Sequence, residues 1–147
     1  MTVSRPWVPL VEGADPRIHP HWPHELDRSG LSLTAIERLA AAVVVSAING
    51  SAYHVNALRR RLDEAGAPAW LADTITTAPQ WPAVDDDRLA AVILYAARLT
   101  TNPSSICEQD LERLRAVDLT ELDIYELAKV VASFNAGNRV ALGLGLR

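Results

Sequence analysis

The chain has 147 residues, of which 49% are hydrophobic and 22% charged, a balance typical of one globular domain with its own core. Its net charge of −4 argues against nucleic acid and against an anionic membrane as partners, because both attract basic proteins. The only cysteine, Cys107, excludes an internal disulfide and favours a reducing, cytoplasmic location. No apolar run is long enough to cross a bilayer, since the longest covers residues 39–48.

Residues 1–30 differ in composition from the rest of the chain. Five prolines between positions 6 and 23 exclude a long helix, so we expect an extended arm with a short helical turn near residues 24–28. Trp7 and Trp22 predict that this arm packs against another surface.

The arm also carries a dense group of imidazoles. These are His19, His21 and His24. Such a group can bind zinc, nickel or copper, but the intervening prolines hold the path extended and no fourth ligand follows in sequence. Surface histidines are the commoner outcome, so we expect no metal and no other cofactor.

From Leu31 onward the chain is predicted to be helical. Thr34 and Glu37 form a capping-box pattern before a long apolar run, and Asn49-Gly50 supplies a stop. Six helices are expected, over residues 35–49, 52–65, 68–76, 87–100, 108–116 and 120–143. No segment alternates with the period of a strand, so the fold class is all-α. We therefore divide the chain into the arm, 1–30, and a helical domain, 31–147.

The first predicted helix has no charged residue after Arg38. A helix that is apolar on every side is buried by its own fold or by a partner subunit. Because a small bundle rarely hides so apolar a helix alone, we expect burial across the subunits of a homo-oligomer.

Two segments of the helical part resemble a known superfamily. They are residues 47–55 (AINGSAYHV) and 134–139 (FNAGNR), the latter preceded by further similar residues within 110–124. Together they are similar to the AhpD-like alkylhydroperoxidase and carboxymuconolactone decarboxylase superfamily, and to its peroxidase-related branch in particular. The resemblance covers residues 31–147 and implies a compact helical bundle that assembles into trimers or hexamers.

Active members of this superfamily carry a Cys-x-x-Cys pair that opens the helix after Asn-Gly, together with a relay histidine and a relay glutamate. A thiol at a helix N-terminus forms its thiolate readily and attacks peroxide, and the second cysteine then closes a disulfide. In this chain the two cysteine positions fall on Ser51 and His54, and the relay positions fall on Leu58 and Leu39. The resemblance therefore implies the framework without the redox machinery.

The interpretation that follows is a divergent member without thiol-peroxidase activity, which keeps an apolar pocket for a small molecule. An alternative is a non-redox acid–base enzyme of the decarboxylase or isomerase kind, in which His54 transfers protons and Ser51 or Tyr53 positions an oxyanion. Plainer roles are a helix N-cap for Ser51 and a hydrogen-bonded interface residue for His54. A second alternative is an alkylhydroperoxidase-type oxidoreductase that uses Cys107 with an external thiol. The sequence thus leaves open whether the chain is an enzyme.

Overall fold

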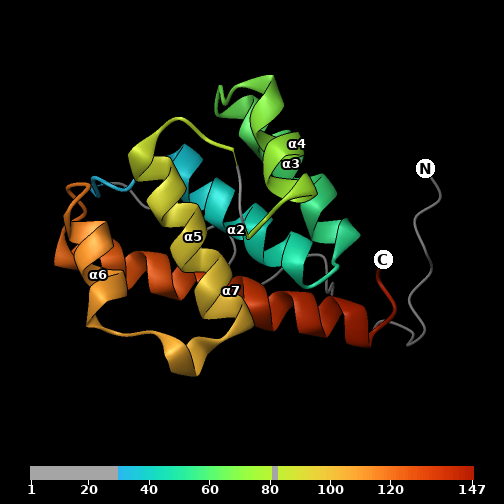
Figure 1. The fold of residues 1–147 in the computed structure, drawn as a ribbon. Coiled ribbons are helices and arrows are strands. Elements are labelled where there is room, and N and C mark those ends of the chain that lie inside the picture. Colours follow the sequence, from blue (N-terminus) through green and yellow to red (C-terminus); the bar gives the residue numbers. More distant parts are fainter. Residues whose placement is uncertain (1–29, 81–82) are drawn as a thin grey trace.

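The computed structural model of the chain describes residues 30–80 and 83–147, which form a bundle of helices (Figure 1). The described residues contain six α-helices, one short 3-10 helix and no strand, as the all-α prediction requires. The elements are α2 (Ala35–Ile48), α3 (Ala52–Glu64), α4 (Ala69–Thr77), α5 (Asp87–Thr101), η1 (Pro103–Ser105), α6 (Glu108–Arg115) and α7 (Glu121–Gly143). Each α-helix begins and ends within one residue of its predicted bounds.

The expectations about the arm, a metal site and a membrane span relate differently to the described residues. The proline-rich arm, with its two tryptophans and with His19, His21 and His24, lies outside the described residues. Across residues 30–80 and 83–147, no group of acidic, histidine or cysteine side chains is arranged to hold a metal ion. Over the same ranges, none of the helices combines the length and the apolar character needed to span a bilayer.

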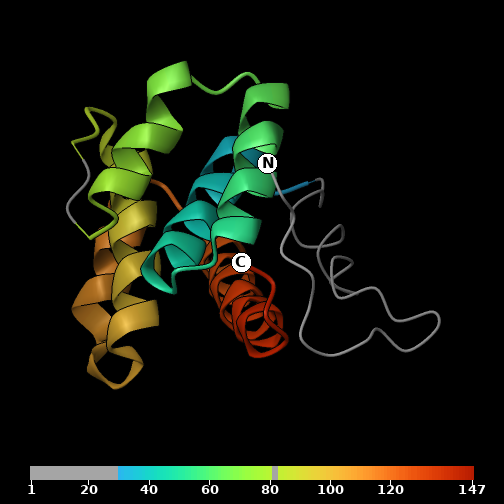
Figure 2. The ribbon, with the colours of Figure 1, turned by 90° about the vertical axis from the view of Figure 1, so that its right-hand side faces the viewer.

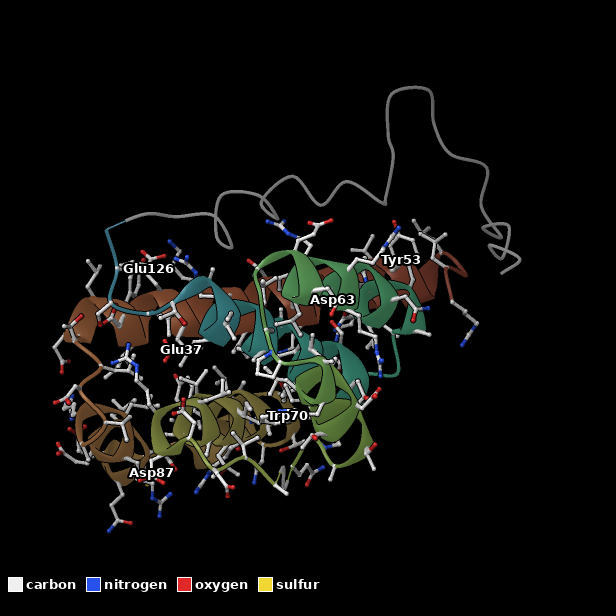
Figure 3. The ribbon with its side chains drawn as sticks, turned by 90° about the horizontal axis from the view of Figure 1, so that it is seen from above. Glu37, Tyr53, Asp63, Trp70, Asp87 and Glu126 are labelled. Atoms are coloured by element: carbon white, nitrogen blue, oxygen red, sulfur yellow. The ribbon has the colours of Figure 1, made fainter. Side chains whose placement is uncertain are left out.

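Helix α2 lies at the centre of the bundle. It packs against α3, α4, α5 and α7, and Figures 2 and 3 show it enclosed between α5 on one side and α7 on the other. The side chains from Leu39 to Val45 are at most 3% exposed. The chain itself therefore buries this helix, so the argument that its apolar length needs a partner subunit is wrong. The trimer or hexamer stays a prediction.

The capping box predicted at the start of α2 is present. Glu37 N donates to Thr34 Oγ1 over 3.1 Å, and Thr34 N donates to Glu37 Oε2 over 2.8 Å. The Glu37 carboxylate also accepts a bond of 2.7 Å from Arg88 Nε, which joins the first turns of α2 and α5. The cap therefore has a second role that local sequence does not reveal, because it anchors a neighbouring helix.

A second polar contact fixes the first turn of α7 against the segment before α2. Asp123 is fully buried, and its carboxylate accepts bonds from Leu33 N, Ser32 Oγ and Thr120 Oγ1. Burial alone would raise the pKa of Asp123, but these hydrogen bonds outweigh it and hold the pKa at about 2. The ionised Asp123 carboxylate therefore links two segments that are far apart in the sequence.

Candidate functional site

The turn between α2 and α3 places the residues of the resembled motif. Gly50 has a φ of 73°, a left-handed conformation that glycine adopts without strain. The chain then doubles back, so that Ser51 N donates to Ser46 O over 2.9 Å. This turn sets Ser51 at the N-cap of α3, one turn of helix away from His54.

Ser51 and His54 form a hydrogen-bonded pair. Ser51 Oγ lies 2.7 Å from His54 Nδ1, and the two residues are 0% and 2% exposed. The Ser51 side chain makes no hydrogen bond to the helix backbone. The plainer role as a side-chain N-cap is therefore wrong, although Ser51 does occupy the N-cap position.

Two aromatic rings flank the His54 imidazole. The Tyr53 ring lies edge-on at 5.3 Å between centroids, and the Phe134 ring of α7 lies edge-on at 6.2 Å. Tyr53 is half-buried and Phe134 is buried. The structure thus brings Ser51, Tyr53 and His54 together, and it buries His54 within a single chain without a subunit interface.

A group of amides and hydroxyls continues from this pair toward α7. Ser46 Oγ donates to Asn138 Oδ1 over 3.1 Å, and Asn49 Nδ2 donates to Asn135 Oδ1 over 3.0 Å. Asn138 is 0% exposed, and its Nδ2 has no hydrogen-bond partner within the described part of the chain. The two segments that carry the family resemblance therefore meet in space, which sequence reasoning could not show.

The two residues that the sequence analysis expects at the relay positions lie in the hydrophobic core. Leu39 of α2 and Leu58 of α3 are both buried among apolar neighbours. Leucine has no group that can transfer a proton, so these positions contribute packing alone.

Cys107 lies elsewhere in the molecule. It lies at the start of α6, as predicted, and is exposed, and its Sγ donates to Asp110 Oδ2 over 3.4 Å. Figures 1 and 2 place α6 well away from α3, so Cys107 is not close to His54 as a joint peroxidase site would require. Its nearest charged contact is a carboxylate, whereas reactive cysteines lie beside cationic groups.

A cavity of about 640 Å³ runs along the outer face of α5. In Figure 3, Asp87 at one end of this face lies at the opposite corner of the molecule from Tyr53. Neither Ser51, Tyr53 nor His54 lines this cavity, so it lies apart from the motif at the start of α3. Its lining includes Gln80, Asp87, Ala90, Ala91, Leu94, Tyr95, Ala97, Arg98, Thr101, Asp110 and Arg113.

Sequence reasoning missed this cavity because it assigned α5 a single apolar face. The face that enters the core carries Leu89, Val92, Ile93 and Ala96, as expected. Ala90, Ala91 and Leu94 form a second apolar stripe at helical spacing, and this stripe faces the cavity. The signal was therefore present in the sequence as a helix with apolar residues on two faces.

Charged groups from α5 and α6 meet at one end of the cavity. Asp110 Oδ1 accepts bonds from Arg98 Nη1 over 3.0 Å and from Arg113 Nη1 over 3.2 Å. The Cys107 backbone N–H lowers the pKa of Asp110, and its thiol and the two arginines act in the same direction against burial. Burial and the nearby Asp110 charge raise the pKa of Tyr95. At neutral pH this end of the cavity therefore holds a carboxylate, two guanidinium groups and a neutral phenol.

No family model matches the chain, and no curated protein matches it. Solved structures do. An uncharacterized peroxidase-related protein from Silicibacter sp. TM1040 is 27% identical with a TM-score of 0.78, over 88% of this chain and 67% of its own. An uncharacterized peroxidase-related protein with an alkylhydroperoxidase AhpD core, from Ralstonia eutropha JMP134, is 26% identical with a TM-score of 0.79, over 87% and 66%. The chain thus spans about two thirds of the length of both.

A third structure shares the fold at lower identity. It is a protein of unknown function from Agrobacterium tumefaciens, named as a candidate antioxidant defence protein AhpD. It is 18% identical with a TM-score of 0.73, and the match covers 86% of this chain and 84% of the other. All three matches cover between 86% and 88% of this chain.

Proposed function

Because this chain belongs to the AhpD-like superfamily, we propose that it is a divergent, peroxidase-related protein that does no dithiol chemistry and instead binds a small molecule. The proposed function differs from that of active superfamily members because this chain lacks their pair of cysteines. Dithiol catalysis needs two cysteines that can form a disulfide, and the chain has Cys107 alone. The pair at the start of α3 is a hydroxyl and an imidazole, which cannot pass through a sulfenic acid.

The observation that carries the binding function is the cavity beside α5. Its volume of about 640 Å³ lies within the range of small-molecule sites, and its lining includes several small apolar side chains. Ala90 and Ala91 leave room that larger residues would fill. Leu94 is partly exposed to this space, which favours an apolar ligand that covers it.

Octan-1-ol is a suitable neutral probe for this proposal. Isothermal titration calorimetry on the full chain should show binding, and Ala91→Leu should weaken it because the larger side chain takes up part of the cavity along α5. Ala132→Leu, on an exposed position of α7, is the matched control and should leave binding unchanged. Absence of binding to the wild-type chain, or equal binding to both variants, would contradict the proposal.

The bond of 2.7 Å between Ser51 Oγ and His54 Nδ1 supports the alternative of a non-redox acid–base enzyme. A hydroxyl at this distance can pass its proton to the imidazole, as general-base catalysis requires. Asn138 Nδ2, which has no hydrogen-bond partner among the described residues, is a donor available to stabilise an oxyanion.

A carboxylated lactone tests the acid–base alternative. If His54 is the base, decarboxylation of this substrate is lost in His54→Gln and retained in Arg60→Gln, an exposed position on the same helix. A wild-type chain that leaves the lactone unchanged removes this alternative.

A further inference from the structure

We propose that the cavity beside α5 takes a medium-chain monocarboxylate, with its head group at Tyr95 and Arg113 and its tail along the apolar stripe of α5. This inference rests on the proposed function and adds the chemical class of the ligand to it.

Two donors without sufficient partners lie at the head end. Tyr95 is 8% exposed and lines the cavity, and its hydroxyl has no hydrogen-bond partner among residues 30–80 and 83–147. The Arg113 side chain is 66% exposed and, within the described part of the chain, donates one bond, from Nη1 to Asp110. The Tyr95 hydroxyl is not one of the fully buried polar atoms that lack a partner, so we place it at the cavity surface, where a ligand that accepts its hydrogen bond gains a contact.

The other charged groups at this end are already satisfied. Arg98 uses Nε and Nη2 on Ser105 and Nη1 on Asp110. Both Asp110 oxygens accept bonds, Oδ2 from Cys107 and Oδ1 from the two arginines. Two guanidinium groups against one carboxylate leave one positive charge in excess, and the Arg113 side chain carries the free donors. An anionic group, and a carboxylate by its planar shape, fits these donors.

The body of the cavity selects an apolar tail. Ala90, Ala91 and Leu94 lie on the face of α5 that leads from Tyr95 toward Asp87. Tyr95 follows Asp87 by eight positions along the helix, a rise of about 12 Å. The Asp87 carboxylate lies at the far end of this stripe, so a second carboxylate on the ligand would meet a like charge there. The cavity therefore favours a monocarboxylate over a dicarboxylate of equal length.

Calorimetry on the full chain with octanoate, octan-1-ol and octanedioate tests this inference. We expect octanoate to bind about tenfold more tightly than octan-1-ol, since one charge-assisted hydrogen bond is worth that ratio. Octanedioate should bind more weakly than octanoate. In Arg113→Gln and in Tyr95→Phe the preference for octanoate over the alcohol should fall severalfold, whereas Arg60→Gln, the matched surface control, should keep it.

The outcomes separate this inference from the proposed function. If octanoate and octan-1-ol bind equally well and Arg113→Gln changes neither, the carboxylate assignment is overturned while the binding function stands. If no ligand binds, both fall. If no ligand binds and Ala91→Leu also changes the mass of the particle in light scattering, the cavity is instead a contact between copies of the chain, which overturns both as well.

Discussion

At the scale of single residues, the pKa of Asp123 predicts how the stability of the fold depends on pH. Its pKa of about 2 in the folded chain lies below the ordinary value of 3.8, so the ionised carboxylate stabilises the fold. That difference corresponds to about 2 kcal/mol above pH 3.8, and this contribution is lost as the pH falls from 3.8 toward 2. We therefore expect Asp123→Asn to lower the free energy of unfolding by about 2 kcal/mol at pH 7.

Urea denaturation of both chains at pH 7 and near pH 2.5 measures this effect. The difference between wild type and Asp123→Asn should shrink at the lower pH, where the wild-type carboxylate begins to protonate. Asp63→Asn, at an exposed position on α3, is the control and should change stability little at either pH. A difference that is independent of pH would show that charge is not the origin of the effect.

The pair of Ser51 and His54 makes a second prediction at this scale. Because the Ser51 side chain bonds to the imidazole and not to the helix backbone, Ser51→Ala should lower stability by about 1 kcal/mol through that bond alone. In a His54→Leu background the same change should have almost no effect. A double-mutant cycle from chemical denaturation measures the coupling, and additive effects of the two substitutions would argue for an N-cap after all.

Residue positions were predicted far better than residue partners. The sequence located Ser51, His54 and Cys107 correctly at helix starts, since caps and glycine stops are local signals. It did not predict that Glu37 binds Arg88, or that Asn138 lies beside Ser46, because those contacts join segments far apart in the chain. Such partners follow from how the helices pack, which periodicity within one helix does not determine.

At the scale of helices, the small buried residues of α2 allow a prediction about stability. Ala41 is fully buried where α2 is enclosed by four other helices, so a larger side chain there has no free volume. We expect Ala41→Leu to lower the free energy of unfolding by about 1–3 kcal/mol through overpacking. Chemical denaturation measures this, with Ala132→Leu on the exposed face of α7 as the matched control. Equal stability of the two variants would show that α2 is not tightly enclosed.

Helix α5 has two apolar faces, and periodicity alone predicted the surroundings of only one of them. Its residues Leu89, Val92 and Ile93 were expected to face the core, and they do. The stripe of Ala90, Ala91 and Leu94 has the same apolar character but faces a cavity. Periodicity identifies an apolar face, yet it does not say whether protein or a ligand covers that face.

At the scale of the whole molecule, the assembly remains a prediction. The apolar length of α2 no longer supports it, because the chain covers that helix itself. Large apolar side chains exposed on α7 do support it, namely Leu122, Tyr125 and Val140. Light scattering at micromolar concentration should give three or six times the chain mass of 16.0 kDa. A stable monomer would contradict this prediction.

The central claim is that an AhpD-like framework here does no dithiol redox chemistry. The most direct measurement is the consumption of an organic hydroperoxide by the purified full chain with a dithiol reductant, for the wild type and for Cys107→Ser. We expect no catalytic turnover by either protein above the uncatalysed rate. Turnover that survives Cys107→Ser and is lost in Ser51→Ala or His54→Gln would contradict the account.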